Sequence, residues 1–133
     1  MTGQPTPEAS GEARRVCRDY FDAFLPTFVD RPLLPGLREL NCCFEVLISD
    51  VSAEPWRLVI EGGRLSYVGH DGPGTADCRY ILDAETAYEI IRVDCAPQDA
   101  FLAGDIDLEG DMELGLTLST VLEPFLQRFR YSP

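Results

Sequence analysis

The chain has few basic residues and no cluster of them. Its 133 residues include 11 Lys and Arg against 23 Asp and Glu, which gives a formal net charge of −12. Binding to phosphate groups needs clustered Lys and Arg, so nucleic acid is not expected as a partner. Anionic membrane surfaces would repel the chain for the same reason.

The sequence motifs of metal, disulfide and nucleophilic chemistry are also missing. The chain has five cysteines but neither a C-x-x-C pair nor a Cys/His ligand spacing, so we expect a reducing environment and no metal site. A Gly-x-Ser-x-Gly elbow and a phosphate-binding glycine loop are absent. Cys42 and Cys43 would point to opposite faces of a strand, and His70 is the only histidine that could activate a thiol. These absences predict no catalytic residue and no cofactor.

Long apolar runs are lacking as well. No stretch is long enough to span a bilayer, and the N-terminus does not begin with the basic region and apolar run of a secretory signal. Residues 1–11 are polar and small, which predicts a disordered tail before one domain over residues 12–133. We therefore expect a cytoplasmic protein without stable membrane insertion.

Apolar periodicity predicts a helix and then four strands. From Glu12 to Phe28, apolar side chains recur at steps of three and four residues, and Pro26 is expected to end or kink this helix near Leu25. Alternating apolar residues then predict strands, of which the second and third are joined by a tight turn at Gly62-Gly63. The alternating positions are Phe44, Val46 and Ile48, then Trp56, Leu58 and Ile60, then the run Arg64 to Val68, then Cys78, Tyr80 and Leu82.

The second half of the chain predicts helices on either side of a fifth strand. Asp83 can cap a helix, and Pro97 can begin a short helical turn that ends near Phe101. A strand is expected over 105–109, followed by a helix over about 111–129 that Pro124 kinks or divides. This order predicts an α+β fold in which helices cover one face of a five-stranded, mostly antiparallel sheet.

Several of these segments, in this order, resemble the sterol-carrier-protein (type-2, nonspecific lipid-transfer) domain family. They are the strand from Trp56, the Gly62-Gly63 hairpin, the strand start at Ala76-Asp77-Cys78, the capped helix after Asp83, and the segment from Phe101 to Leu114. The resemblance covers roughly residues 44–126. It implies an apolar tunnel between sheet and helices that binds and carries a lipid or another apolar molecule.

Six apolar residues are candidates for the wall of this tunnel. Met112 and Leu116 lie off the main apolar stripe of the last helix, and such a face must meet a ligand, the tail or a partner subunit. Ordinary core packing is the alternative role for each candidate. The full set is Phe24, Trp56, Phe101, Met112, Leu116 and Phe125.

The fifth strand bears on the charge of the ligand. Members of the family commonly carry lysines there, whereas this chain has Asp105 and Asp107. Acidic side chains near the mouth of the tunnel would oppose an anionic headgroup, so we expect a neutral or cationic apolar ligand, and of these a neutral one. The alternating carboxylates of Asp105, Asp107 and Glu109 match no calcium-loop pattern and predict a solvated acidic face rather than a cation site.

Two other classes of function stay open at this point. The tunnel could be the active site of a cyclase or isomerase in which Asp77, Asp83, His70 or Tyr80 moves protons. Alternatively, the off-stripe helix face could form a homodimer or bind another protein. If the protein is an enzyme, a carboxylate or histidine should point into the cavity. If it is a carrier, the cavity should be entirely apolar, and if it is an interaction module, there should be no cavity.

Overall fold

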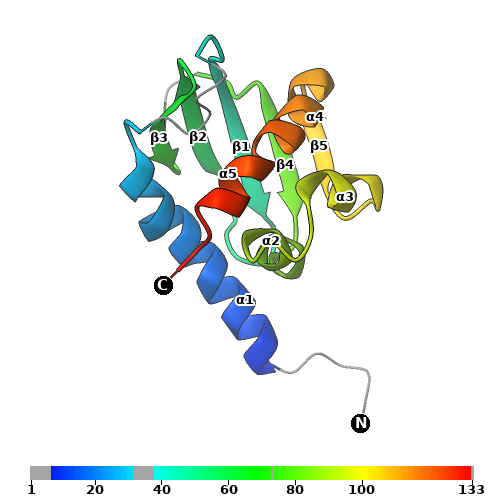
Figure 1. The fold of residues 1–133 in the computed structure, drawn as a ribbon. Helices are drawn as coiled ribbons and strands as arrows, with labels where there is room; N and C mark the ends of the chain where they lie inside the picture. Colours follow the sequence, from blue (N-terminus) through cyan, green and yellow to red (C-terminus); the bar gives the residue numbers. More distant parts are fainter. Residues whose placement is uncertain (1–6, 32–37, 73, 133) are drawn as a thin grey trace.

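The computed structural model describes residues 7–31, 38–72 and 74–132, and of side chains before residue 11 nothing is described (Figure 1). Helix α1 (Pro7–Asp19) begins earlier than the start at Glu12 that periodicity predicts. The rest of the expected tail, residues 1–6, lies outside the described residues.

The first helical segment changes its pitch twice. After α1 comes a π-helical turn, η1 (Tyr20–Phe24), and then a 3₁₀ turn, η2 (Leu25–Phe28), with Pro26 near its start. A π turn takes in one extra residue, which changes the direction of the side chains that follow. Tyr20, Phe21, Leu25 and Phe28 are all buried.

Five strands form a mixed sheet in the order β3-β2-β1-β4-β5. The pairing between β1 and β4 is parallel, and the other three pairings are antiparallel. The fifth strand begins two residues later than the alternation predicts. The strands are β1 (Cys42–Ile48), β2 (Trp56–Glu61), β3 (Arg64–Gly69), β4 (Cys78–Leu82) and β5 (Asp107–Gly110).

The tight turn between β2 and β3 is confirmed. Gly62 and Gly63 have φ angles of 61° and 73°, a conformation that most side chains rarely adopt. Both angles are those of the hairpin turns whose twist matches the flanking strands. The Asn41 side-chain oxygen accepts a hydrogen bond from the Gly62 N–H at 2.9 Å, which ties this turn to the start of β1.

Four helices follow strand β4, two before β5 and two after it: α2 (Ala84–Ile91), α3 (Pro97–Leu102), α4 (Met112–Val121) and α5 (Glu123–Arg128). Asp83 caps α2 as predicted, since its carboxylate accepts a hydrogen bond from the Thr86 N–H at 2.9 Å. Asp111 caps α4 in the same way through the Leu114 N–H at 3.0 Å. The last predicted helix is divided into α4 and α5, with Pro124 in the first turn of α5.

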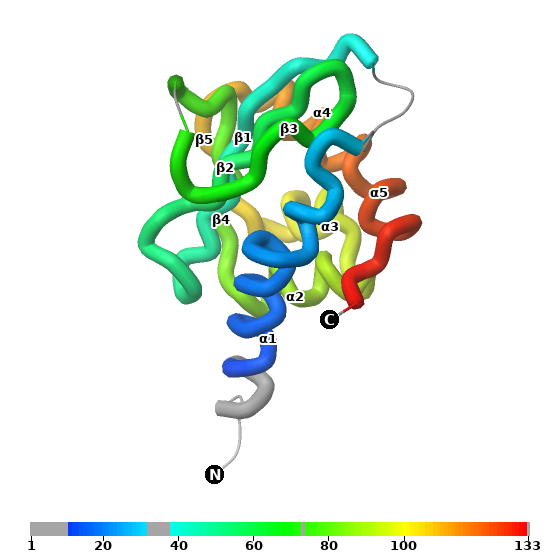
Figure 2. The backbone as a smooth tube through the Cα atoms, turned by 90° about the vertical axis from the view of Figure 1, so that its left-hand side faces the viewer, coloured from blue at the N-terminus to red at the C-terminus, as the bar shows by residue number. Residues whose placement is uncertain are grey.

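All helices lie against one face of the sheet, which we call the inner face (Figures 1 and 2). The opposite, outer face carries an ion network in which Glu45 accepts hydrogen bonds from Arg57 at 3.2 Å and from Arg79 at 2.8 Å. Within the described residues, no helix is both long and apolar enough to cross a bilayer.

An aromatic cluster joins the two ends of the described chain. Phe28 lies 5.3 Å from Phe125 and 5.2 Å from Phe129 between ring centroids, and Tyr131 lies 5.4 Å from Phe24. The Tyr131 hydroxyl also donates a hydrogen bond to the Asp19 carboxylate. Aromatic pairs at such distances stabilise beyond their buried area. The cluster consists of Tyr20, Phe24, Phe28, Phe125, Phe129 and Tyr131.

Three glycine-to-alanine variants separate backbone strain from steric contact. Gly110 has φ 90°, and a Cβ there would lie 2.5 Å from the Asp77 carbonyl oxygen, so Gly110→Ala should cost about 2 kcal/mol or more. Gly104 has φ 85° with open space around it, and its change should cost only about 1 kcal/mol. Gly11→Ala in helix α1 should stabilise by about 0.5–1 kcal/mol. Denaturant unfolding checks this order, and equal losses at Gly104 and Gly110 would contradict it.

Candidate functional site

A cavity of about 140 Å³ lies between the inner face of the sheet and the helices. It is the candidate ligand site. Its wall is formed by Tyr20, Phe21, Leu25, Phe44, Val46, Leu58, Ile60, Tyr80, Leu82, Ala87, Ile90, Ile91, Pro97, Phe101, Ile106, Ser119, Leu122, Phe125 and Leu126.

The sheet contributes alternate residues of its three central strands to the wall. Phe44 and Val46 come from β1, and matching pairs come from β2 and β4, because residues two apart in a strand share a face. Val46 is only half-buried, although β1 has a neighbouring strand on either side and Val46 faces the helices. We attribute its remaining exposure to the hollow that the helices leave open above it.

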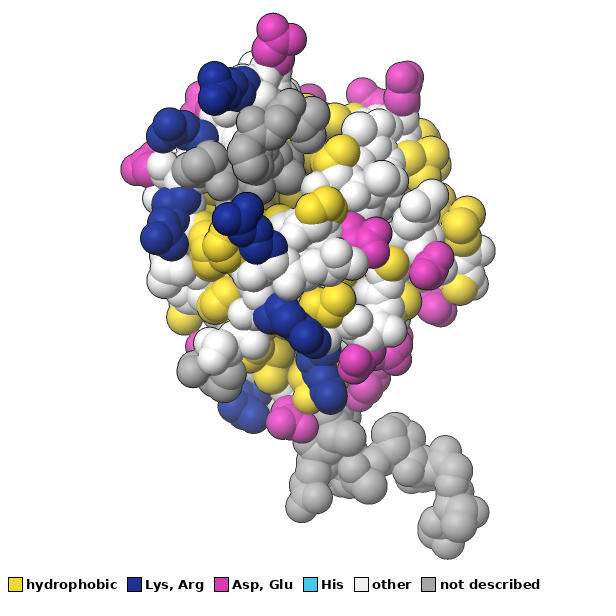
Figure 3. Space-filling view, in the orientation of Figure 1, with side chains coloured by type: hydrophobic (Ala, Val, Ile, Leu, Met, Phe, Trp, Pro, Cys, Tyr) yellow, Lys and Arg dark blue, Asp and Glu magenta, His cyan; other side chains and the backbone are white. Residues whose placement is uncertain are grey.

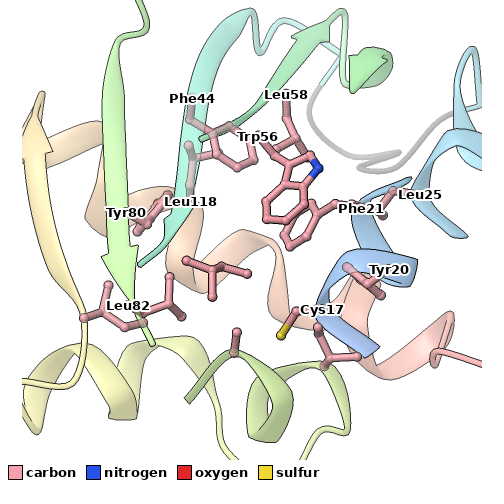
Figure 4. Packing of buried hydrophobic residues seen from close by; sticks show 14 of the residues in the cluster. Cys17, Tyr20, Phe21, Leu25, Phe44, Trp56, Leu58, Tyr80, Leu82 and Leu118 are labelled. Atoms are coloured by element: carbon pink, nitrogen blue, oxygen red, sulfur yellow. The ribbon is translucent and has the colours of Figure 1, made fainter. Parts of the chain in front are cut away.

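The helical wall comes from segments far apart in the sequence. Figure 4 shows Tyr20, Phe21 and Leu25 projecting from the N-terminal helical segment toward the sheet residues Phe44 and Leu58. The other wall residues come from α2, from α3, from the α4–α5 segment and from Ile106, which precedes β5. The cavity therefore depends on the correct packing of both ends of the domain.

Among the described residues of the wall, three carry hydroxyl groups and none carries a charged side chain. The Tyr80 hydroxyl donates to the Gly115 carbonyl at 2.6 Å, and the Ser119 hydroxyl donates to the Leu116 carbonyl at 2.7 Å. Only apolar atoms of these residues face the cavity. Burial raises the pKa of Tyr20 and of Tyr80 above the usual tyrosine range, so both stay neutral at physiological pH.

The six residues predicted from the sequence fall into three groups. Phe101 and Phe125 line the cavity. Phe24 and Trp56 lie behind the wall, where Phe24 stacks on Tyr20 at 5.4 Å and Trp56 stacks on Phe21 at 5.0 Å.

Met112 and Leu116, the third group, lie outside the cavity on the surface of α4, where 50% and 43% of each residue is exposed. Their position off the main apolar stripe indicated a helix face that the core does not need. The sequence did not show whether that face lines the cavity or is exposed to solvent. The sequence reasoning also missed small wall residues such as Ala87 and Ser119, because helical periodicity does not distinguish the wall of a hollow from solid core.

The groups considered for proton transfer do not line the cavity, apart from the hydrogen-bonded Tyr80. The His70 ring contacts the Pro55 carbonyl through Nδ1 at 3.1 Å and packs over Trp56. The Asp77 carboxylate accepts a hydrogen bond from the Cys43 N–H at 2.9 Å, and Asp83 caps α2. Each of these side chains thus has a structural contact outside the cavity.

The expectation that acidic residues of β5 lie at the mouth of the cavity needs correction. Leu108 packs against Gly115 of α4, and its neighbours Asp107 and Glu109 must therefore point to the outer face. Glu109 lies opposite Arg79 in the strand register, beside the Glu45 network. The charge of Asp107 therefore does not select the ligand from within the cavity.

The comparisons with known proteins agree on a family. The profile of the SCP-2 sterol transfer family matches residues 21–123, which is most of the chain. The chain belongs to the SCP-2 sterol transfer family. No curated protein sequence matches it significantly.

Solved structures share the fold of this SCP-2 domain at low sequence identity. One is described as "UbiJ-SCP2 Ubiquinone synthesis protein", with a TM-score of 0.59, 20% identity, and coverage of 84% of this chain and 97% of that one. Another is a crystal structure of sterol carrier protein 2, with a TM-score of 0.59, 13% identity, and coverage of 93% and 97%.

The same fold also occurs as a small part of a larger protein. A variant of the sec-alkyl sulfatase PisA1 matches with a TM-score of 0.57 and 20% identity over 84% of this chain. The SCP-2 domain spans only 16% of that sulfatase chain.

The cysteines of the SCP-2 domain are protonated at neutral pH. Burial raises the pKa of Cys17 and of Cys42 to about 12 and that of Cys78 to about 11, with nearby carboxylates adding to the effect. A neutral thiol is a poor nucleophile and a poor metal ligand. Within the described residues, no group of three or more His, Cys, Asp or Glu side chains is placed to hold a metal ion.

The buried thiols predict a loss of stability at alkaline pH. Above an ordinary thiol pKa near 9, the unfolded chain releases protons that folded Cys17 keeps until about 12, so the free energy of unfolding should fall across this window. Cys17→Ala should make the fall shallower by up to about 1.4 kcal/mol per pH unit. Urea unfolding with a reductant at several pH values measures this. Val16→Ala, also buried in α1, is the control and should keep the wild-type slope.

Proposed function

We propose that this SCP-2 domain binds and carries an apolar, uncharged small molecule in the cavity between its sheet and its helices. The observation that carries the proposal is the wall itself. It is made of apolar and aromatic side chains with three hydroxyl-bearing residues, and no charged side chain belongs to it in the described structure. Ligand sites are typically concave, mostly apolar and largely formed in advance.

The wall favours a neutral ligand because a buried charge would find no partner there. An unpaired carboxylate or phosphate in an apolar cavity loses its hydration without compensation. Two of the hydroxyls donate to backbone carbonyls, and only apolar atoms of the wall face the cavity, so the wall offers a ligand no hydrogen-bonding group. The ligand class is therefore an apolar body with at most a small neutral polar group.

The size of the cavity limits what it holds without rearrangement. A volume near 140 Å³ corresponds to about one small aromatic ring. A sterol or a long alkyl chain needs more room, which the half-buried wall residues Leu122 and Leu126 of the α4–α5 segment can provide by moving outward. Phe101 and Phe125 are the sequence-predicted residues that we propose as direct ligand contacts.

The similar proteins support an apolar ligand in general terms. Their descriptions name sterol, ubiquinone synthesis and an alkyl sulfatase. The carrier role is preferred over catalysis because His70, Asp77 and Asp83 all have contacts outside the cavity. The cytoplasmic location and the homodimer stay predictions.

A pair of fluorescent probes tests the preference for neutral ligands. A single-ring fluorophore with an uncharged alkyl chain should bind at least about tenfold more tightly than the same fluorophore and chain ending in a carboxylate, because the wall offers no cation. Titration at low and high salt separates this burial effect from repulsion by the net charge, which salt screens. Equal affinities at high salt would contradict a cavity that excludes charge, and no binding of either probe would contradict the carrier function.

Filling the cavity should remove binding without unfolding the domain. Val46→Phe adds volume from the middle of the sheet, and Ala87→Leu adds it from α2. Each should weaken the neutral probe by about tenfold or more while thermal unfolding stays near wild type, since the added groups enter existing space. Leu116→Arg is the control, because its exposed position outside the wall predicts unchanged probe binding. A loss in Leu116→Arg that equals the loss in Val46→Phe would place the probe elsewhere.

A further inference from the structure

Three large hydrophobic residues are strongly exposed in the described structure, and all lie on the neighbouring helices α3 and α4. They are Leu102, Met112 and Leu116, with 75%, 50% and 43% exposure. Leu102 ends α3, and the other two lie on α4, which packs against α3. We call these three residues the α3–α4 patch. Exposed apolar side chains that gather on one part of a soluble domain indicate an interaction surface.

The patch is not a continuation of the core. Helix α4 already buries Gly115, Leu118 and Ser119 against the sheet and the cavity. Met112 and Leu116 are four residues apart and share a second helix face beside the buried one. This face has no partner among the described residues, so the apolar side chains on it are accessible to another molecule.

The segment that carries the patch has acidic but no basic side chains. Residues 93–127 contain no Lys, Arg or His, although the whole chain has 11 Lys and Arg. In Figure 3 the basic side chains lie on the left, central and lower parts of the face shown, whereas the right-hand part, over α3 and α4, shows acidic and apolar side chains among uncharged ones and no basic side chain. The carboxylates of this segment are Asp94, Asp99, Asp105, Asp107, Glu109, Asp111, Glu113 and Glu123.

We infer that the α3–α4 patch docks a basic amphipathic helix of a different protein. Such a helix places apolar side chains on Leu102, Met112 and Leu116 and its Lys or Arg side chains on the carboxylates around them. Complementary charge speeds association and suppresses partners of the wrong sign.

A second copy of the chain fits less well. Two copies with a charge of −12 each repel one another. The acidic patch of one copy could meet a basic surface elsewhere on a second copy only in a head-to-tail contact. Repeated head-to-tail contacts build open filaments unless the rotation between copies closes them into a ring.

The position of the patch links docking to the cavity. Phe101 lines the cavity, and the next residue, Leu102, is the most exposed member of the patch. A docked helix would therefore lie beside one wall of the cavity. The inference rests on exposure and charge alone, so it holds or fails independently of ligand binding.

A synthetic helical peptide with Leu along one face and Arg on both flanks tests the inference by fluorescence anisotropy. It should bind the domain, and the same peptide with Glu in place of Arg should not. The variant L102S/M112S/L116S should weaken binding by about tenfold or more, because apolar anchors carry most of the affinity of such contacts. Circular dichroism checks that this variant stays folded, which its exposed positions predict.

A matched pair of charge variants locates the electrostatic part. D99N/E113Q removes two carboxylates near the patch, and E54Q/E61Q removes two exposed carboxylates outside the 93–127 segment, with the same change in net charge. The first should weaken peptide binding by about threefold, and the second should leave it unchanged. Equal effects, or binding that survives L102S/M112S/L116S, would overturn the docking site.

Two further measurements distinguish the other occupants. Binding of zwitterionic phospholipid vesicles that L102S/M112S/L116S abolishes would assign the patch to a membrane surface and overturn the inference. Sedimentation that shows self-association of the wild type, lost in the same variant, would assign it to a second copy and overturn it as well. A monomer without vesicle binding, together with charge-selective peptide binding, supports it.

Discussion

The structure depends on one packing constraint: the helices span the inner face of the sheet without filling the space below them. Protein interiors are normally close-packed, so a hollow persists only where rigid neighbours prevent collapse. Here the aromatic cluster supplies that rigidity. Phe28 packs on both Phe125 and Phe129, and these contacts join the N-terminal and C-terminal helical segments that cover the cavity.

The two faces of the sheet show how the charges are kept away from the hollow. Residues that point inward from the central strands are apolar or aromatic, and those that point outward include Glu45, Arg57 and Arg79, joined by hydrogen bonds. The alternation of a strand therefore sorts charge to one side and the cavity wall to the other. A shift of one residue in the register would exchange the two sets, so the register itself protects the cavity.

Local signals in the sequence predicted most of the secondary structure but little of the cavity. Alternating apolar residues specify the strands, and the pair Gly62-Gly63 specifies the hairpin. Asp83 specifies the start of α2, because its side chain accepts a hydrogen bond from the backbone N–H three residues further along. The parallel pairing of β1 with β4 has no such local signal, because alternation does not name the partner of a strand. The family resemblance, rather than periodicity, gave the expectation of a space between sheet and helices.

The exposed pair on α4 shows the limit of such reasoning. Met112 and Leu116 were identified as apolar residues that the core does not need, and the structure agrees that the core does not use them. Whether such residues face a hollow or the solvent depends on where α3 and β5 lie, which is a tertiary property. The position of Asp107 was mispredicted for the same reason, because the face to which it points follows from the packing of Leu108 against Gly115 of α4, which is a tertiary contact.

The aromatic cluster also sets the order in which the domain can be completed during synthesis. Chains emerge from the ribosome with the N-terminal part first. The sheet and the first helical segment are present before residues 125–131 have been added, and until then Phe28 lacks its partners Phe125 and Phe129. The nascent domain therefore displays part of its apolar inner face until α5 has been added, and a ligand present at that stage meets an open binding surface rather than a closed cavity.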